Sequence, residues 1–136
     1  MGLYLDNSKM FAVEQNYFTT YAASPPAQNI GIRVKNTNNA EDEFYKNDFN
    51  TLDVSIQAEG KNWWRHNRYG LAYYCNDNQN NEYDFYVAGD YNYDGIQRFQ
   101  GSDTRVAGNT FSTVPNEIGN FDNESVYTID YYYDQN

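Results

Sequence analysis

The chain has 136 residues, which is the size of one domain, and we expect a single all-β domain over residues 1–136. Its formal net charge of -10, with nine Lys and Arg residues, argues against a nucleic-acid partner, because binding to a phosphate backbone depends on clustered basic side chains. A single cysteine excludes an intramolecular disulfide, and no apolar run is long enough for a transmembrane helix, so we expect no membrane insertion.

The amino-terminal half alternates between apolar and polar residues with the period of a half-buried strand. This alternation predicts strands over residues 11–21, 30–35 and 51–58. Between the second and third of these, an acidic run follows Asn39, and an asparagine cap with acidic residues behind it favours a helix start. We therefore expect at most one short helix, near residues 39–46.

The carboxy-terminal half is rich in aromatic residues that alternate with polar ones. Strands are predicted over residues 69–75, 83–87 and 125–133, with a shorter segment at 104–106. The chain then holds about seven to nine strands at spacings of about 8 to 12 residues, which is typical of sandwiches and barrels. Because strands do not alternate with helices, a parallel α/β sheet is not expected. We predict a single antiparallel β-sandwich of jelly-roll or Greek-key type.

Two segments share a pattern that suggests an internal repeat, AVEQNYFT from Ala12 and AGDYNYDG from Ala88. About 30 residues further on they are followed by NDFNTLDVSI and FDNESVYTIDY, and Asn47, Asp48 and Thr51 make the first of these similar to the N-D-x-x-S-S strand entry of the Greek-key motif in βγ-crystallins. The preceding corner differs from that motif, because Ala12 and Ala88 stand where an aromatic residue is needed. We therefore assign the chain to no family.

The segment DYNYDG, residues 90–95, has the oxygen-bearing alternate positions and the glycine with which calcium-binding loops begin. The candidate calcium ligands are the side chains of Asp90, Asn92, Asp94 and Asp103 and the backbone carbonyl of Ile96. The twelfth position of the loop, where such sites carry an acid, is Gly101. Because Asn, Asp and Gly also favour hairpin turns, the sequence predicts either a calcium site or a turn here.

The adjacent Trp63 and Trp64, with Tyr69 nearby, are the candidate binding residues. An exposed indole or phenol ring can stack on a sugar ring or on a partner's side chain. Neighbouring residues on a strand face opposite sides, so at most one of the two indoles is expected to serve as a platform. No catalytic residues are expected, because the chain has one histidine, His66, and its only cysteine, Cys75, is predicted to pack on an apolar face.

These features favour a non-catalytic structural or binding module, a subunit of an extracellular or virion-type assembly that uses aromatic-rich surfaces. Two alternatives stay open: a carbohydrate-binding module stabilised by calcium, and a small acidic inhibitor or immunity protein that blocks a basic site. The partners expected are therefore another protein, further copies of the chain or a glycan. The amino terminus has no apolar core of signal-peptide length, so the compartment stays open, with an extracellular or virion surface slightly favoured.

Overall fold

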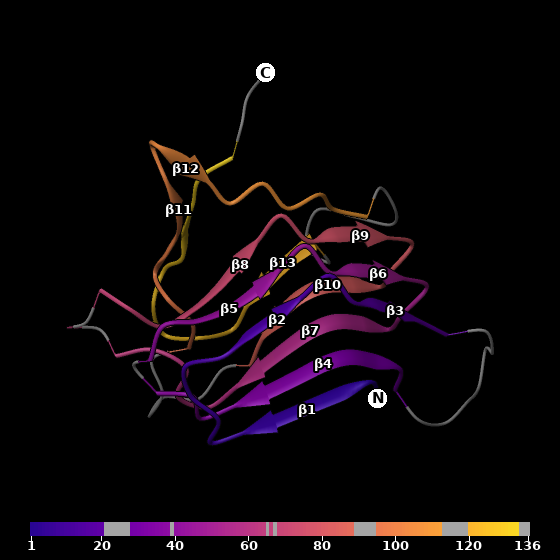
Figure 1. Ribbon diagram of the computed structural model, residues 1–136, viewed down its shortest axis with the longest axis horizontal. Helices are drawn as coiled ribbons and strands as arrows, with labels where there is room; N and C mark the ends of the chain where they lie inside the picture. Colours follow the sequence, from indigo (N-terminus) through magenta and orange to yellow (C-terminus); the bar gives the residue numbers. More distant parts are fainter. Residues whose placement is uncertain are drawn as a thin grey trace.

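The chain forms a parallel β-solenoid of about four turns. The computed structural model describes residues 1–20, 28–38, 40–64, 66, 68–88, 95–112 and 120–133. In Figure 1 the strands β1, β4, β7 and β10 run side by side, with the amino terminus beside β1, while β11 and β12 rise away from the stack. Among the described residues, no helix is long and apolar enough to cross a membrane.

The strands of the described residues form four hydrogen-bonded groups. The large sheet has the order β1 (Leu3–Asp6), β4 (Ile30–Lys35), β7 (Val54–Glu59), β10 (Tyr83–Val87) and β13 (Phe121–Asn123). The second sheet has the order β2 (Ala12–Glu14), β5 (Asp42–Tyr45) and β8 (Leu71–Tyr74). The third sheet has the order β3 (Tyr17–Thr19), β6 (Asp48–Asn50) and β9 (Asp77–Gln79). The C-terminal sheet has the order β12 (Arg105–Val106), β11 (Phe99–Ser102) and β14 (Asp130–Tyr131).

The predicted antiparallel sandwich is wrong, because the strands of the three stacked sheets pair in parallel. Leu3 lies opposite Ile32, and Ile32 lies opposite Ile56. In the first three turns the chain returns to the large sheet through a strand of the second sheet and a strand of the third. Strands therefore replace the helices that usually connect parallel strands, which is why the lack of helices did not exclude a parallel sheet.

The positions of some individual strands were predicted better than the arrangement of the strands in sheets. The strands predicted over residues 30–35 and 83–87 are confirmed by β4 and β10. Residues 11–21 do not form one strand, because a corner at Gln15 and Asn16 separates β2 from β3. Of residues 125–133, only Asp130–Tyr131 form a strand.

The short helix predicted near residues 39–46 is wrong, since residues 42–45 form β5. Phe44 of this strand is fully buried and lies opposite Val13 and Tyr73 of the adjacent turns. Burial of a large apolar side chain between two turns outweighs the weak local preference of an asparagine and an acidic run for a helix start.

An asparagine ladder marks the corner between the second and third sheets. The main-chain N–H and side-chain Nδ2 of each asparagine donate to the Oδ1 of the next, at 2.9–3.1 Å, in the order Asn16, Asn47, Asn76 and Asn109. The residue before each of them has a positive φ: Gln15, Lys46, Cys75 and Gly108. Cys75 is therefore exposed at a corner instead of packing on an apolar face. Because each amide joins two turns, the ladder fixes the register of the stack.

A column of aromatic rings runs through the interior of the solenoid. The ring centroids of Phe11 and Phe44 are 5.7 Å apart, those of Phe44 and Tyr73 are 5.7 Å apart, and those of Tyr73 and Phe85 are 4.9 Å apart. Tyr73 is fully buried, and its hydroxyl has no hydrogen-bond partner among the described residues. The column thus includes one polar atom whose burial costs stability.

We expect Tyr73→Phe to raise the free energy of unfolding by about 1 kcal/mol, because the substitution removes an unsatisfied hydroxyl and keeps the ring. Urea denaturation of the two proteins measures the difference. Tyr131→Phe is the matched control, since the Tyr131 hydroxyl accepts hydrogen bonds from the main-chain N–H and Nδ2 of Asn109 and its removal should lower stability. A loss of stability in Tyr73→Phe would contradict the expectation.

Candidate functional site

A groove of about 1010 Å³ is the candidate functional site. Its described lining residues come from the outer face of the second sheet, from the connection between β7 and β8, and from the C-terminal sheet with its flanking segments. Its charged and aromatic lining residues include Glu41, Asp42, Glu43, Trp63, His66, Arg68, Tyr69, Tyr74, Arg98, Phe99, Arg105 and Tyr127. Aromatic and charged side chains therefore meet in one concave surface.

The connection between β7 and β8 is anchored by the buried side chain of Asn62. Its Nδ2 donates to the carbonyl of Glu59 at 2.9 Å, and its Oδ1 accepts from the main-chain N–H of Thr37 at 3.2 Å. Trp63 then forms an antiparallel bridge with Gly70. A Cβ at position 70 would lie 2.7 Å from Cδ1 of Trp63, so this close approach needs a glycine. The bridge closes a loop that presents Tyr69 to the groove.

The C-terminal sheet is attached to the solenoid through Gln100, which is fully buried. Its Oε1 accepts from the main-chain N–H of Tyr73 at 2.8 Å, and its Nε2 donates to the carbonyls of Leu71 and Gln97 at 3.2 and 2.7 Å. A side chain thus satisfies main-chain groups of β8. In the turn that follows β11, Ser102 Oγ accepts from the main-chain N–H of Arg105 at 3.1 Å. These bonds hold the β11–β12 hairpin beside the second sheet.

Two arginines of the groove lie over aromatic rings. The guanidinium carbon of Arg105 is 4.1 Å from the ring centroid of Tyr74, and its Nη2 lies 3.9 Å from a carboxylate oxygen of Glu43. The guanidinium carbon of Arg98 is 5.0 Å from the ring centroid of Phe99. Stacking of this kind restrains a long side chain and leaves the edge of the guanidinium free to donate hydrogen bonds.

Asp42 is the buried acid of the groove. Its carboxylate accepts a hydrogen bond from the main-chain N–H of Phe11 at 3.2 Å. Burial raises the pKa of the Asp42 carboxyl above its ordinary value, and the bond from Phe11 only partly opposes this rise. Of the three acidic residues in sequence, Asp42 is thus held away from solvent, whereas Glu41 is exposed and Glu43 is partly buried.

The structure separates the three predicted aromatic residues. Trp63 and Tyr69 both line the groove, although Trp63 is buried and its indole packs edge-on against Tyr127. Trp64 is exposed but is not among the lining residues, and the ammonium of Lys61 lies 3.5 Å from its ring centroid. The two indoles thus have different surroundings, as the alternation of side chains along an extended chain implies.

Several groove residues were not identified from the sequence. Tyr74 and Phe99 carry no local signal that distinguishes them from the many other aromatic residues, and Arg98 and Arg105 belong to no motif. They reach the groove because β11 lies beside β8 in the fold, which only the topology reveals.

Three of the candidate calcium ligands, Asp90, Asn92 and Asp94, lie outside the described residues. Ile96 has a buried side chain in the core, and Asp103 is exposed in the turn between β11 and β12. No group of three or more His, Cys, Asp or Glu side chains suited to a metal ion occurs in the described part of the chain. Calcium binding by this loop stays a prediction.

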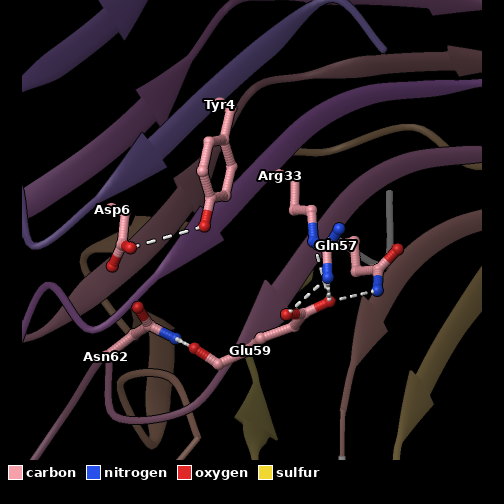
Figure 2. A network of polar contacts seen from close by, with 6 residues as sticks. All are labelled: Tyr4, Asp6, Arg33, Gln57, Glu59 and Asn62. Carbon is pink, nitrogen blue, oxygen red and sulfur yellow. Dashed lines mark hydrogen bonds and ion pairs between the residues drawn. The ribbon is translucent and has the colours of Figure 1, made fainter.

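The outer face of the large sheet carries another group of polar side chains, in which Arg33 and Glu59 are paired (Figure 2). Nε and Nη2 of Arg33 each donate to a carboxylate oxygen of Glu59 at 2.9 Å, and Nε2 of Gln57 donates to the same carboxylate at 2.6 Å. The hydrogen bond to Glu59 raises the pKa of Arg33. Because this pair joins β4 to β7 and has few free donors, we assign it to the stability of the sheet.

Comparison of the chain with models of known protein families, with curated proteins and with solved structures finds no match.

Proposed function

We propose that this protein is a non-catalytic binding module and that its groove binds a glycan. A carbohydrate-binding module is one of the alternatives that the sequence leaves open. The single observation that supports it best is the meeting of aromatic rings with charged hydrogen-bonding side chains in one groove, on the outer face of a sheet stacked by regular hydrogen bonds. Sugar rings present apolar C–H faces to aromatic side chains and hydroxyls to charged groups, so both kinds of contact contribute to binding.

Tyr69 is the residue with which to test the groove. It lines the groove and is 47% exposed, so its substitution leaves the core intact. We expect Tyr69→Ala to weaken retention on immobilised polysaccharides and to lower the affinity for soluble oligosaccharides by about tenfold, because a stacking ring is lost. Affinity electrophoresis against a panel of polysaccharides identifies a ligand, and titration calorimetry then measures its affinity.

Trp64→Ala is the matched control for this experiment. Trp64 is 46% exposed, close to the value for Tyr69, but it is not among the residues that line the groove. Its substitution should leave glycan affinity unchanged. If Trp64→Ala weakened binding as much as Tyr69→Ala, or if no glycan were retained by the unchanged protein, the groove would not be the glycan site.

A role as a subunit of an extracellular or virion-type assembly is a second candidate function. One observation favours it: among the described residues, β1, β2 and β3 of the first turn each pair on one side only. Unpaired strand edges are surfaces on which further strands can add. Light scattering at micromolar concentration tests this candidate, which predicts an oligomer, and a monodisperse monomer contradicts it.

A further inference from the structure

The positive side chains of this acidic protein are unevenly distributed. The whole chain has nine Lys and Arg residues against nineteen Asp and Glu. Three of the nine, Arg68, Arg98 and Arg105, line the groove together with the only histidine, His66. Outside the groove, Arg33 is engaged by both oxygens of Glu59. In the groove an anion would therefore meet several positive groups, although three acids line the same groove.

Arg105 has the geometry of an anion receptor. Its side chain is 60% exposed and lies over the ring of Tyr74, and its side-chain nitrogens form no hydrogen bond with a described residue. The nearest carboxylate, that of Glu43, is 3.9 Å away, which is longer than a hydrogen bond. A guanidinium restrained on a ring with its donors free can bind a carboxylate or a sulfate with two parallel hydrogen bonds.

Arg98 supports the same chemistry from β11. Its Nε donates to Asp130 at 2.9 Å, a single bond that leaves the terminal nitrogens available, and about half of the side chain is exposed. Three acids, at positions 41–43, also line the groove, so an anion would be bound by the free guanidinium donors of Arg98 and Arg105 and not by a net positive charge of the groove.

We infer that the groove selects an anionic glycan, one that carries carboxylate or sulfate groups, and that Arg98 and Arg105 are its specificity-determining residues. This inference rests on the proposed glycan-binding function. It names the class of sugar that the same groove takes. The ring of Tyr69 then contacts the apolar face of a sugar, the ring of Tyr74 restrains Arg105, and the two arginines bind the acidic substituents.

The experiment compares pairs of oligosaccharides that differ in charge. Oligogalacturonate is measured against its methyl-esterified form, and sulfated dextran oligomers against unsulfated dextran, by titration calorimetry. The inference predicts that an anionic member of at least one pair binds about tenfold or more tightly than its neutral counterpart. Which pair shows the difference distinguishes carboxylate from sulfate recognition.

Salt dependence supplies a second readout with a defined sign. The net charge of -10 repels polyanions at long range, so binding governed by the whole protein would strengthen as salt is added. Binding governed by the arginines of the groove should weaken as salt is added. A gain of affinity for the anionic oligosaccharide at higher salt would overturn the inference.

Two substitutions with the same change of charge complete the test. Arg105→Gln should lower the affinity for the anionic oligosaccharide about tenfold and leave the affinity for the neutral one unchanged. Arg33→Gln, on the outer face of the large sheet, should change neither affinity.

If both members of a pair bind equally and Tyr69→Ala weakens the binding of both, the proposed glycan site is supported and the inference about charge fails. If no member of either pair binds, the inference fails as well, and whether the polysaccharide panel retains the protein then decides the proposed function separately.

Discussion

Asn76→Ala is expected to lower the free energy of unfolding by about 3–5 kcal/mol, which is a large part of the stability of a domain of this size. Asn76 is fully buried in the middle of the asparagine ladder. Its Oδ1 accepts two hydrogen bonds from Asn47, and its Nδ2 donates to the carbonyl of Phe44 at 3.0 Å. Alanine leaves the main-chain N–H of Asn47 and the carbonyl of Phe44 buried without these partners. Urea denaturation followed by circular dichroism measures the loss.

Asn16→Ala is the control at the first position of the ladder. Asn16 is exposed, and its main-chain N–H can still donate to Asn47 after the substitution. We therefore expect a loss of about 0.5 kcal/mol. The double variant Asn47→Ala with Asn76→Ala should cost less than the sum of the single variants, because the first substitution already breaks the bonds between the two residues. Equal losses at Asn16 and Asn76 would contradict a ladder that stabilises the stack through burial.

The ladder also explains why the repeating turns of the solenoid are hard to recognise in the sequence. Successive ladder asparagines are separated by 31, 29 and 33 residues, so no fixed period exists. The residues before them, Gln15, Lys46, Cys75 and Gly108, share a left-handed backbone and no chemistry. Three of these four are residue types that rarely adopt a positive φ. The corners therefore share only the asparagine that follows, and asparagine also occurs at many other positions of the chain. Ala12 belongs to β2 of the second sheet, whereas Ala88 directly follows β10 of the large sheet, so these two residues do not occupy equivalent places in the fold.

Alternation identified some strands correctly, such as β4 and β10, and gave no information about their partners. Parallel sheets usually read as continuous apolar runs, because both of their faces are buried. In β4, however, Ile32 and Val34 are fully buried while Arg33 and Lys35 are partly exposed, since the outer face of the large sheet is solvated. A solenoid strand thus has the same pattern as a strand in a sandwich. Only the pairing register, which depends on distant residues, separates the two folds.

Only part of the candidate site was predictable, because its other residues, like the pairing register, depend on contacts between distant parts of the chain. Trp63 and Tyr69 stood out because bulky rings cluster with basic residues in one short segment. Arg105 and Tyr74 are 31 positions apart in the sequence, and they meet because Gln100 ties β11 to β8. Such a site is produced by the fold, so the sequence could indicate one side of the groove and not the other.

Phe44→Ala is expected to cost about 3–5 kcal/mol of stability, since a fully buried ring is replaced by a cavity in the aromatic column. Phe44 lies between Phe11 of the preceding turn and Tyr73 of the following turn, with centroid distances of 5.7 Å to each. A side chain in the middle of a solenoid is covered from both neighbouring turns, so it has little room to relax. Thermal and urea denaturation of the variant measure the effect.

Phe11→Ala is the matched control, because it removes the same kind of side chain from the preceding turn, where Val13 lies opposite Phe44 in the sheet and the Phe11 ring contacts Phe44 from just before β2. Phe11 is only partly buried, and within the described residues its ring is packed against the core from the side of Phe44. A loss of about 1–2 kcal/mol is therefore expected, clearly below that of Phe44→Ala. In a sandwich the loss of stability would depend on where the ring lies between the two sheets. In a solenoid it depends on whether the ring lies in an end turn or in a middle turn of the stack. Equal costs at Phe11 and Phe44 would thus count against parallel stacking of these turns.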